Sequence, residues 1–110
     1  MNQPLPAGID LERLQAIARR LREQYGAERV LLYGSVARGE ATPDSDVDIL
    51  VVADTREKFF DRMAQVLQLV RDLYDLIPLA PIVLTPAEVQ GRLEKGDHFI
   101  EEILRTGREL

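Results

Sequence analysis

Along the first fifty or so residues, hydrophobic and polar positions first follow the spacing of a helix and then the spacing of two strands. Apolar residues recur every three to four positions from residue 14 to residue 25, which is typical of an amphipathic helix, and Gly26 follows as its expected end. The run Val30–Tyr33 (VLLY) predicts a short buried strand. A second strand is predicted over residues 46–53, where acidic and aliphatic residues alternate before a wholly apolar stretch.

The second half of the chain continues this alternation of elements. Helical spacing extends from Phe59 to Leu73, and residues 77–84 (IPLAPIVL) form a third candidate strand with two prolines. Because proline cannot donate to a strand ladder, we expect an edge strand or one that begins only at Ile82. Residues 85–88 (TPAE) have the pattern of a capped helix start. This order predicts an α/β or α+β fold, a small sheet covered by helices.

A last helix is predicted before Gly107. Its apolar residues are expected on one side and its polar residues on the other: Phe99, Ile100, Ile103 and Leu104 against Glu101, Glu102 and Arg105. We expect the apolar side to pack on the chain's own sheet, with a second subunit of an oligomer as the alternative. His98 is expected to be a surface residue.

Composition narrows the possible functions. The 110 residues suit a single domain, 1–110, in which residues 1–8 are a loose lead-in. The absence of Cys excludes a thiolate metal site, and a single His makes a zinc site within the chain improbable. We find no membrane-spanning run and no signal-peptide pattern, so we expect a cytoplasmic protein. The net charge of −5 argues against a nucleic-acid partner.

The candidate chemistry lies between Tyr33 and Val52 (YGSVARGEATPDSDVDILVV). Asp46 and Asp48 are two positions apart on a strand, so both side chains should project to the same side. Two carboxylates in that position repel each other, and a divalent cation would compensate. Mg²⁺ typically uses one or two carboxylates and completes its shell with water and substrate phosphates.

Gly34-Ser35 supplies a candidate phosphate-binding element. A glycine at a strand end lets backbone approach a ligand closely, and the residues after it can open a short helix whose free N–H groups favour anions. Ser35 can donate a hydroxyl to a phosphate, and Arg38 could reach a phosphate or a carboxylate. Each feature alone is weakly specific, since Asp46 and Asp48 could be an exposed strand end and Arg38 a structural ion-pair partner.

Taken together, these residues form the signature GS-x10-DxD. The sequence here resembles the minimal nucleotidyltransferases of the DNA polymerase beta superfamily, over nearly the whole chain. The resemblance implies a polymerase-beta-like palm with a mixed sheet. It also implies that Gly34 and Ser35 contact the triphosphate of a nucleotide, most often ATP, and that Asp46 and Asp48 bind magnesium. The implied reaction moves a nucleoside monophosphate to an acceptor and releases pyrophosphate.

The resemblance further implies a protein partner. Minimal nucleotidyltransferases commonly pair with HEPN proteins in toxin–antitoxin modules, in which the nucleotidyltransferase is the antitoxin and adenylylates a tyrosine of the HEPN ribonuclease. The alternative is a non-catalytic antitoxin that neutralises its partner by forming a complex. Transfer to a small molecule is a weaker alternative, because relatives with that activity use an extra domain to hold the acceptor.

One expected acidic residue is missing. The superfamily usually carries a third carboxylate on the strand after the long helix, and alignment on Thr85-Pro86 puts that position at Ala80. No carboxylate lies between Asp75 and Glu88. Asp75 is therefore either the displaced third acid, and a further metal ligand, or a helix-end aspartate facing water. The spacing favours the second interpretation, so the Asp46 and Asp48 pair is a firmer prediction than catalytic turnover.

Overall fold

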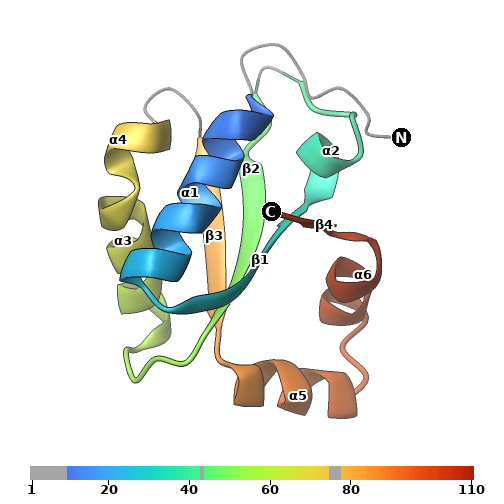
Figure 1. The fold of residues 1–110 in the computed structure, drawn as a ribbon. Coiled ribbons are helices and arrows are strands. Elements are labelled where there is room, and N and C mark those ends of the chain that lie inside the picture. Colours follow the sequence, from blue (N-terminus) through green and yellow to red (C-terminus); the bar gives the residue numbers. More distant parts are fainter. Residues whose placement is uncertain (1–9, 43, 75–77) are drawn as a thin grey trace.

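A four-stranded mixed sheet lies at the centre of the protein (Figure 1). The computed structural model describes residues 10–42, 44–74 and 78–110. The strand order is β3-β2-β1-β4. β1 is antiparallel to both β2 and β4, whereas β2 and β3 are parallel. The strands are β1 (Ala27–Tyr33), β2 (Val47–Ala53), β3 (Leu79–Leu84) and β4 (Arg108–Glu109).

Helices cover both faces of this sheet. On one face lie α1 (Leu11–Gln24), α3 (Phe59–Leu69) and the short α4 (Arg71–Tyr74), as Figure 1 shows. On the other lie α5 (Pro86–Glu94) and α6 (His98–Thr106). A single turn, α2 (Gly34–Ala37), directly follows β1. The α/β or α+β class predicted from the order of elements is therefore confirmed.

The first helix forms as its pattern predicts. Asp10 caps it by accepting a hydrogen bond from the Glu12 backbone N–H at 2.9 Å. The helix ends at Gln24, and Gly26 follows with a φ of 75°, a left-handed conformation that favours glycine. Its buried side chains pack on the sheet and are Leu14, Ile17, Ala18 and Leu21.

The central strand β2 separates two hydrophobic clusters. Val47, Ile49 and Val51 face the core beneath α1 and α3. Leu50 and Val52 face the second core, beneath α5 and α6. Burial on both faces explains why the strand is almost wholly apolar. Since side chains alternate along a strand, Asp48 lies on the same face as Leu50, the face that α6 covers.

The helix predicted from Phe59 to Leu73 is interrupted. α3 ends at Leu69, and Val70 leaves helical geometry with φ −114° and ψ 12° before α4 begins. Arg20 on α1 donates to the Leu69 carbonyl at 3.0 Å and to Asp72 at 2.8 Å. This guanidinium satisfies a helix-end carbonyl and holds α4 against α1, which apolar spacing alone could not reveal.

The proline-containing strand is an edge strand, as one of the two interpretations predicted. β3 pairs with β2 alone and spans Leu79–Leu84, so it begins before Ile82. The edge position tolerates Pro81, because proline has no N–H to donate to a ladder. The first predicted position, Ile77, lies outside the described residues.

A buried arginine connects α3 to the start of α5. The Arg62 residue is only 7% exposed and donates to the carbonyls of Glu57 at 2.8 Å and Val83 at 3.2 Å. It also pairs with the Glu88 carboxylate at 2.6 Å. Glu88 simultaneously completes the predicted capping box with Thr85. One carboxylate thus starts the helix and neutralises the buried cation.

The C-terminal segment contains a strand that the sequence pattern did not predict. α6 begins at His98, which is exposed as expected, and Ile100 and Ile103 bury against the sheet. After Gly107, the two residues of β4 pair with Leu31 and Leu32 of β1. α6 thus packs on its own sheet, as expected, and β4 fastens its end to β1.

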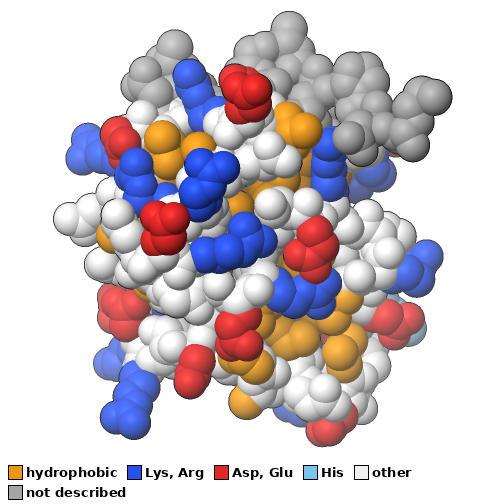
Figure 2. Space-filling view, viewed as in Figure 1, with side chains coloured by type: hydrophobic (Ala, Val, Ile, Leu, Met, Phe, Trp, Pro, Cys, Tyr) orange, Lys and Arg blue, Asp and Glu red, His pale blue; other side chains and the backbone are white. Residues whose placement is uncertain are grey.

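Positive and negative side chains are interspersed on the surface. Figure 2 shows Lys and Arg alternating with Asp and Glu over the face that carries α1. Among the helices of the described ranges, none has both the length and the apolar character needed to cross a membrane.

Candidate functional site

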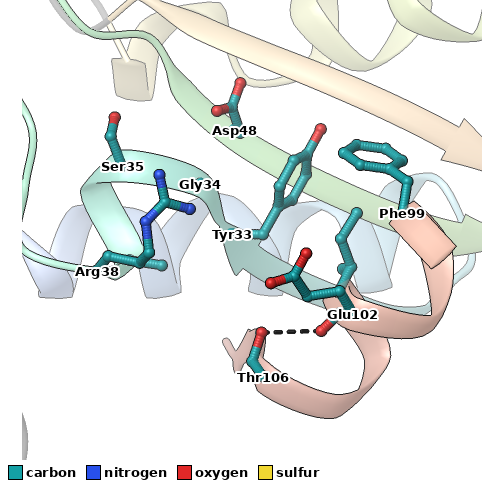
Figure 3. Close-up of a pocket in the computed structure, with 11 residues that line it drawn as sticks. Tyr33, Gly34, Ser35, Arg38, Asp48, Phe99, Glu102 and Thr106 are labelled. Atoms are coloured by element: carbon teal, nitrogen blue, oxygen red, sulfur yellow. Dashed lines mark hydrogen bonds between the residues drawn. The ribbon is translucent and has the colours of Figure 1, made fainter.

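A pocket of about 530 Å³ opens where β1, α2, β2 and α6 meet (Figure 3). It collects residues from the predicted motif and from the C-terminal helix, which are far apart in sequence. The lining residues are Tyr33, Gly34, Ser35, Ala37, Arg38, Asp48, Phe99, Glu102, Ile103, Thr106 and Gly107. Four predicted site residues therefore share one cavity, namely Gly34, Ser35, Arg38 and Asp48.

Gly34 is required at its position for two reasons. Its φ is +78°, which L side chains rarely adopt. A Cβ atom built on it would also overlap Oδ2 of Asp48. The register explains this proximity, because Tyr33 on β1 pairs with Asp48 on β2. The glycine therefore leaves room for the carboxylate, and the two halves of the motif meet at this point.

Asp48 occupies an electrostatically unfavourable place. Partial burial raises the pKa of its carboxyl above the ordinary value of 3.8, and the charge of Asp46 raises it further. The Arg38 guanidinium acts in the opposite direction and lowers the pKa. Asp46 is exposed and lies one residue before β2, which begins at Val47 and not at Asp46 as predicted. It is not among the pocket-lining residues, but its charge is felt at Asp48.

Arg38 follows α2 and lies beside the pocket. Figure 3 shows its guanidinium extending into the space between Ser35, Asp48 and Glu102. Its Nε donates to Glu40 at 3.1 Å, and both side chains of this pair are more than half exposed. Such an exposed ion pair contributes little to stability, so its exchange for a ligand would cost little.

Tyr33 and Phe99 bring aromatic surface to the pocket. Their rings meet edge to face, with centroids 5.6 Å apart and an interplanar angle of 84°. Burial raises the pKa of the Tyr33 phenol to about 12, and the Asp48 charge adds to this shift. The phenol therefore stays protonated and neutral near pH 7.

Sequence reasoning missed the contribution of α6. Glu102 was expected on a polar side facing away from the apolar stripe, but it lines the pocket with Phe99. Phe99, Glu102, Ile103 and Thr106 have the spacing i, i+3, i+4 and i+7, which places them on one helix face. That spacing was a usable signal, but the strand pairing of β4 was needed to know what this face covers. The Thr106 hydroxyl donates a hydrogen bond to the Glu102 carbonyl of the same helix at 2.8 Å, so its proton is already used within α6.

The position of the missing third carboxylate is now defined by the register. Ala80 on β3 pairs with Asp48 on β2, so the position to which the sequence resemblance assigned a third acid stands beside the site. Asp75 lies outside the described residues. Within residues 10–42, 44–74 and 78–110, no three Asp, Glu or His side chains gather closely enough to hold a metal ion together.

The donor set nevertheless fits magnesium. Two carboxylates with no nitrogen or sulfur ligand beside them are typical for Mg²⁺, whose remaining positions are filled by water and substrate phosphates. Asp48 lines the pocket, so a ligand in the pocket can reach its carboxylate. Asp46 and Asp48 are the residues that would hold the ion.

Comparison with known proteins identifies a family that covers most of the chain. The family model "Nucleotidyltransferase domain" matches residues 14–106. A protein of Methanocaldococcus jannaschii named "Putative protein adenylyltransferase MJ1379" is 32% identical over 84 residues, which cover 76% of this chain and 80% of that protein. The protein adenylyltransferase MntA of Thermococcus cleftensis is 45% identical over 49 residues, which cover 41% of this chain and 50% of that protein.

A solved structure is also similar. The crystal structure at 1.40 Å of a "putative nucleotidyltransferase" from Sulfolobus solfataricus shares 26% sequence identity with this chain. The similarity covers 82% of this chain and 85% of that one, with a TM-score of 0.45.

Proposed function

The chain belongs to the nucleotidyltransferase domain family, and from this premise we propose that it transfers a nucleoside monophosphate, AMP from ATP, to a partner protein in a Mg²⁺-dependent reaction. The observation that carries the proposal is the junction of Gly34 and Asp48 at one pocket. Nucleotidyl transfer needs a backbone that a phosphate can approach closely, which Gly34 offers, and a carboxylate that can hold a metal ion, which Asp48 offers. The pairing of β1 with β2 brings these two residues together.

The residues of the pocket divide the work of binding. Asp46 and Asp48 would hold the ion, which would neutralise phosphate charge and help to orient the triphosphate. Ser35 and Arg38 contact the β- and γ-phosphates, which become the leaving pyrophosphate. The acceptor oxygen forms a bond to the α-phosphorus as the bond to the bridging oxygen breaks. Positioning by these groups supplies most of the rate enhancement.

The acceptor is proposed to be a HEPN-type protein, with this chain as the antitoxin of the pair. The family resemblance supports the HEPN partner, and two relatives whose names describe protein adenylyltransferases support a protein as the acceptor. The acidic balance of the chain, −5, favours a protein acceptor over a nucleic acid.

The test uses co-expressed partner and radiolabelled ATP. Wild type with Mg²⁺ should label the partner, and the Asp46→Asn/Asp48→Asn variant should not. The control is Asp44→Asn/Asp54→Asn, which removes two exposed carboxylates that do not line the pocket. Equal labelling by the site variant and the control variant would refute transfer at this site.

A second candidate function rests on Ala80. Because the third carboxylate is replaced there, the chain could act as a non-catalytic antitoxin that neutralises its partner by binding alone. Cell-growth rescue separates the two functions. If the Asp46→Asn/Asp48→Asn variant still suppresses the partner's toxicity, neutralisation by binding is favoured. If it keeps binding but loses protection, the enzymatic function is favoured.

A further inference from the structure

The pocket has two chemically different ends. Figure 3 shows Ser35 and Arg38 at one end and Phe99 at the other, with Asp48 and Tyr33 between them. The first end carries a hydroxyl and a guanidinium. The second carries the ring of Phe99, which meets the ring of Tyr33 beside it. A ligand that fits both ends has an anionic part and a flat apolar part.

Phe99 lies at the surface and is not part of the buried core. It is 49% exposed, whereas Ile100 and Ile103 of the same helix are 1% and 3% exposed and pack on the sheet. Its one described aromatic neighbour is Tyr33, which its ring meets at 84°. The two rings thus form a right-angled aromatic corner, defined here as Tyr33 and Phe99, and both residues line the pocket.

The phenol of Tyr33 suits a binding role. Tyr33 lines the pocket, and its hydroxyl can donate a hydrogen bond to a ligand from the ring edge.

We propose that the aromatic corner of Tyr33 and Phe99 is the nucleobase subsite of this pocket. The base stacks on one ring and meets the edge of the other, while the triphosphate runs toward Gly34, Ser35 and Arg38. This inference rests on the proposed function, because it assumes that a nucleotide occupies the pocket. A volume of about 530 Å³ lies within the range of small-molecule sites, ~300–1,000 Å³.

The experiment separates the base from the triphosphate. Calorimetric titrations with Mg²⁺ compare ATP with inorganic triphosphate, which has no base. Phe99→Leu keeps an apolar side chain but removes the ring. Because stacking on an aromatic side chain contributes ~1–3 kcal/mol, this variant should bind ATP about five-fold to 150-fold more weakly. Its affinity for triphosphate should not change.

Two matched variants complete the design. Phe60→Leu changes a phenylalanine that is 78% exposed on α3 and does not line the pocket, so both affinities should match wild type. Phe99→Tyr keeps an aromatic ring and should retain ATP affinity, which also guards against misfolding of the leucine variant. Asp46→Asn/Asp48→Asn should weaken both ligands.

The outcomes distinguish the inference from the proposed function. Unchanged ATP affinity in Phe99→Leu overturns the nucleobase subsite, while Mg²⁺-dependent triphosphate binding that needs Asp46 and Asp48 leaves the proposed function standing. Unchanged ATP affinity with lost labelling of the partner would place the acceptor's side chain in the corner instead, and the inference would again be wrong. If wild type binds neither ligand in the presence of its partner, the proposed function fails and takes the inference with it.

Discussion

Replacement of Gly34 by alanine should destabilise the chain and disturb the site. The same replacement at Gly26 serves as the control, because it measures the cost of the backbone conformation alone. Gly34 and Gly26 have nearly the same backbone conformation, with φ of +78° and +75°. A Cβ atom at Gly26 would meet nothing within 4 Å, whereas one at Gly34 would overlap Oδ2 of Asp48. Gly26→Ala therefore carries the backbone penalty alone, and Gly34→Ala carries the same penalty plus displacement of a carboxylate.

The magnitudes follow from these two terms. A non-glycine residue in the left-handed region costs ~1–2 kcal/mol. Turning Asp48 away from its rotamer costs a further ~0.5–1.5 kcal/mol. At about 4 °C per kcal/mol for a domain of this size, Gly26→Ala should lower the Tm by about 4–8 °C and Gly34→Ala by about 6–14 °C. Only Gly34→Ala should weaken Mg²⁺-dependent nucleotide binding.

A double-mutant cycle with Asp48→Ala isolates the overlap. That substitution removes the carboxylate and leaves Cβ of residue 48, which lies 3.5 Å from a Cβ at position 34 and so in ordinary van der Waals contact. In the Asp48→Ala background, Gly34→Ala should cost only ~1–2 kcal/mol, the same as Gly26→Ala. Urea denaturation measures the stabilities and calorimetry the binding. Equal stability losses in all three comparisons, with nucleotide binding intact in Gly34→Ala, would refute the reasoning.

Three further predictions concern charge. Burial and then the charge of Asp46 raise the pKa of Asp48, so on acidification Mg²⁺-dependent nucleotide binding should be lost at a pH above the ordinary aspartate pKa of 3.8. A raised pKa in the folded state also means that the protonated form of Asp48 is the more stabilising one, and this stabilisation is lost as the pH rises. Asp48→Asn should therefore raise the Tm of the ligand-free chain at pH 7. Arg62→Met should destabilise the fold by ~3 kcal/mol in urea titrations. It should also flatten the acid dependence, since Arg62 is the main cause of the lowered pKa of Glu88 and stability is lost as pH falls through that pKa. Ala80→Asp should increase partner labelling relative to Ala80→Asn, and no gain would show that position 80 does not limit transfer.

Local patterns in the sequence predicted much of this fold, because a strand period or a helix start is determined by residues that are close together in the chain. The alternation at residues 46–49 was enough to place Val47 and Ile49 in the core and Asp48 on the opposite face. The same kind of reasoning found the capping box at Thr85. Each of these depends only on the period of a strand or on a helix start.

The wall that α6 contributes to the pocket could not be predicted in this way. Its position depends on the pairing of β4 with β1, and a two-residue strand has no recognisable period. At the break before α4, the Leu69 carbonyl accepts a hydrogen bond from Arg20, a contact between residues that are far apart in sequence. Asp46 and Asp48 could be proposed as a metal-binding pair from their spacing in the sequence. The aromatic corner could not be predicted, because Tyr33 and Phe99 meet only in the folded chain.

The pairing of Tyr33 with Asp48 has a consequence for how related sequences can differ in length. Insertions or deletions between residues 39 and 45 change only the connection between two elements already aligned by the sheet, and loops tolerate such changes. One residue added within β1 or β2 would move Gly34 about 3.3 Å along the ladder and turn every later side chain of that strand to the other face. Length can therefore vary between residues 39 and 45, whereas the two strands and the turn α2, with the pocket residue Arg38 after it, have to keep their spacing.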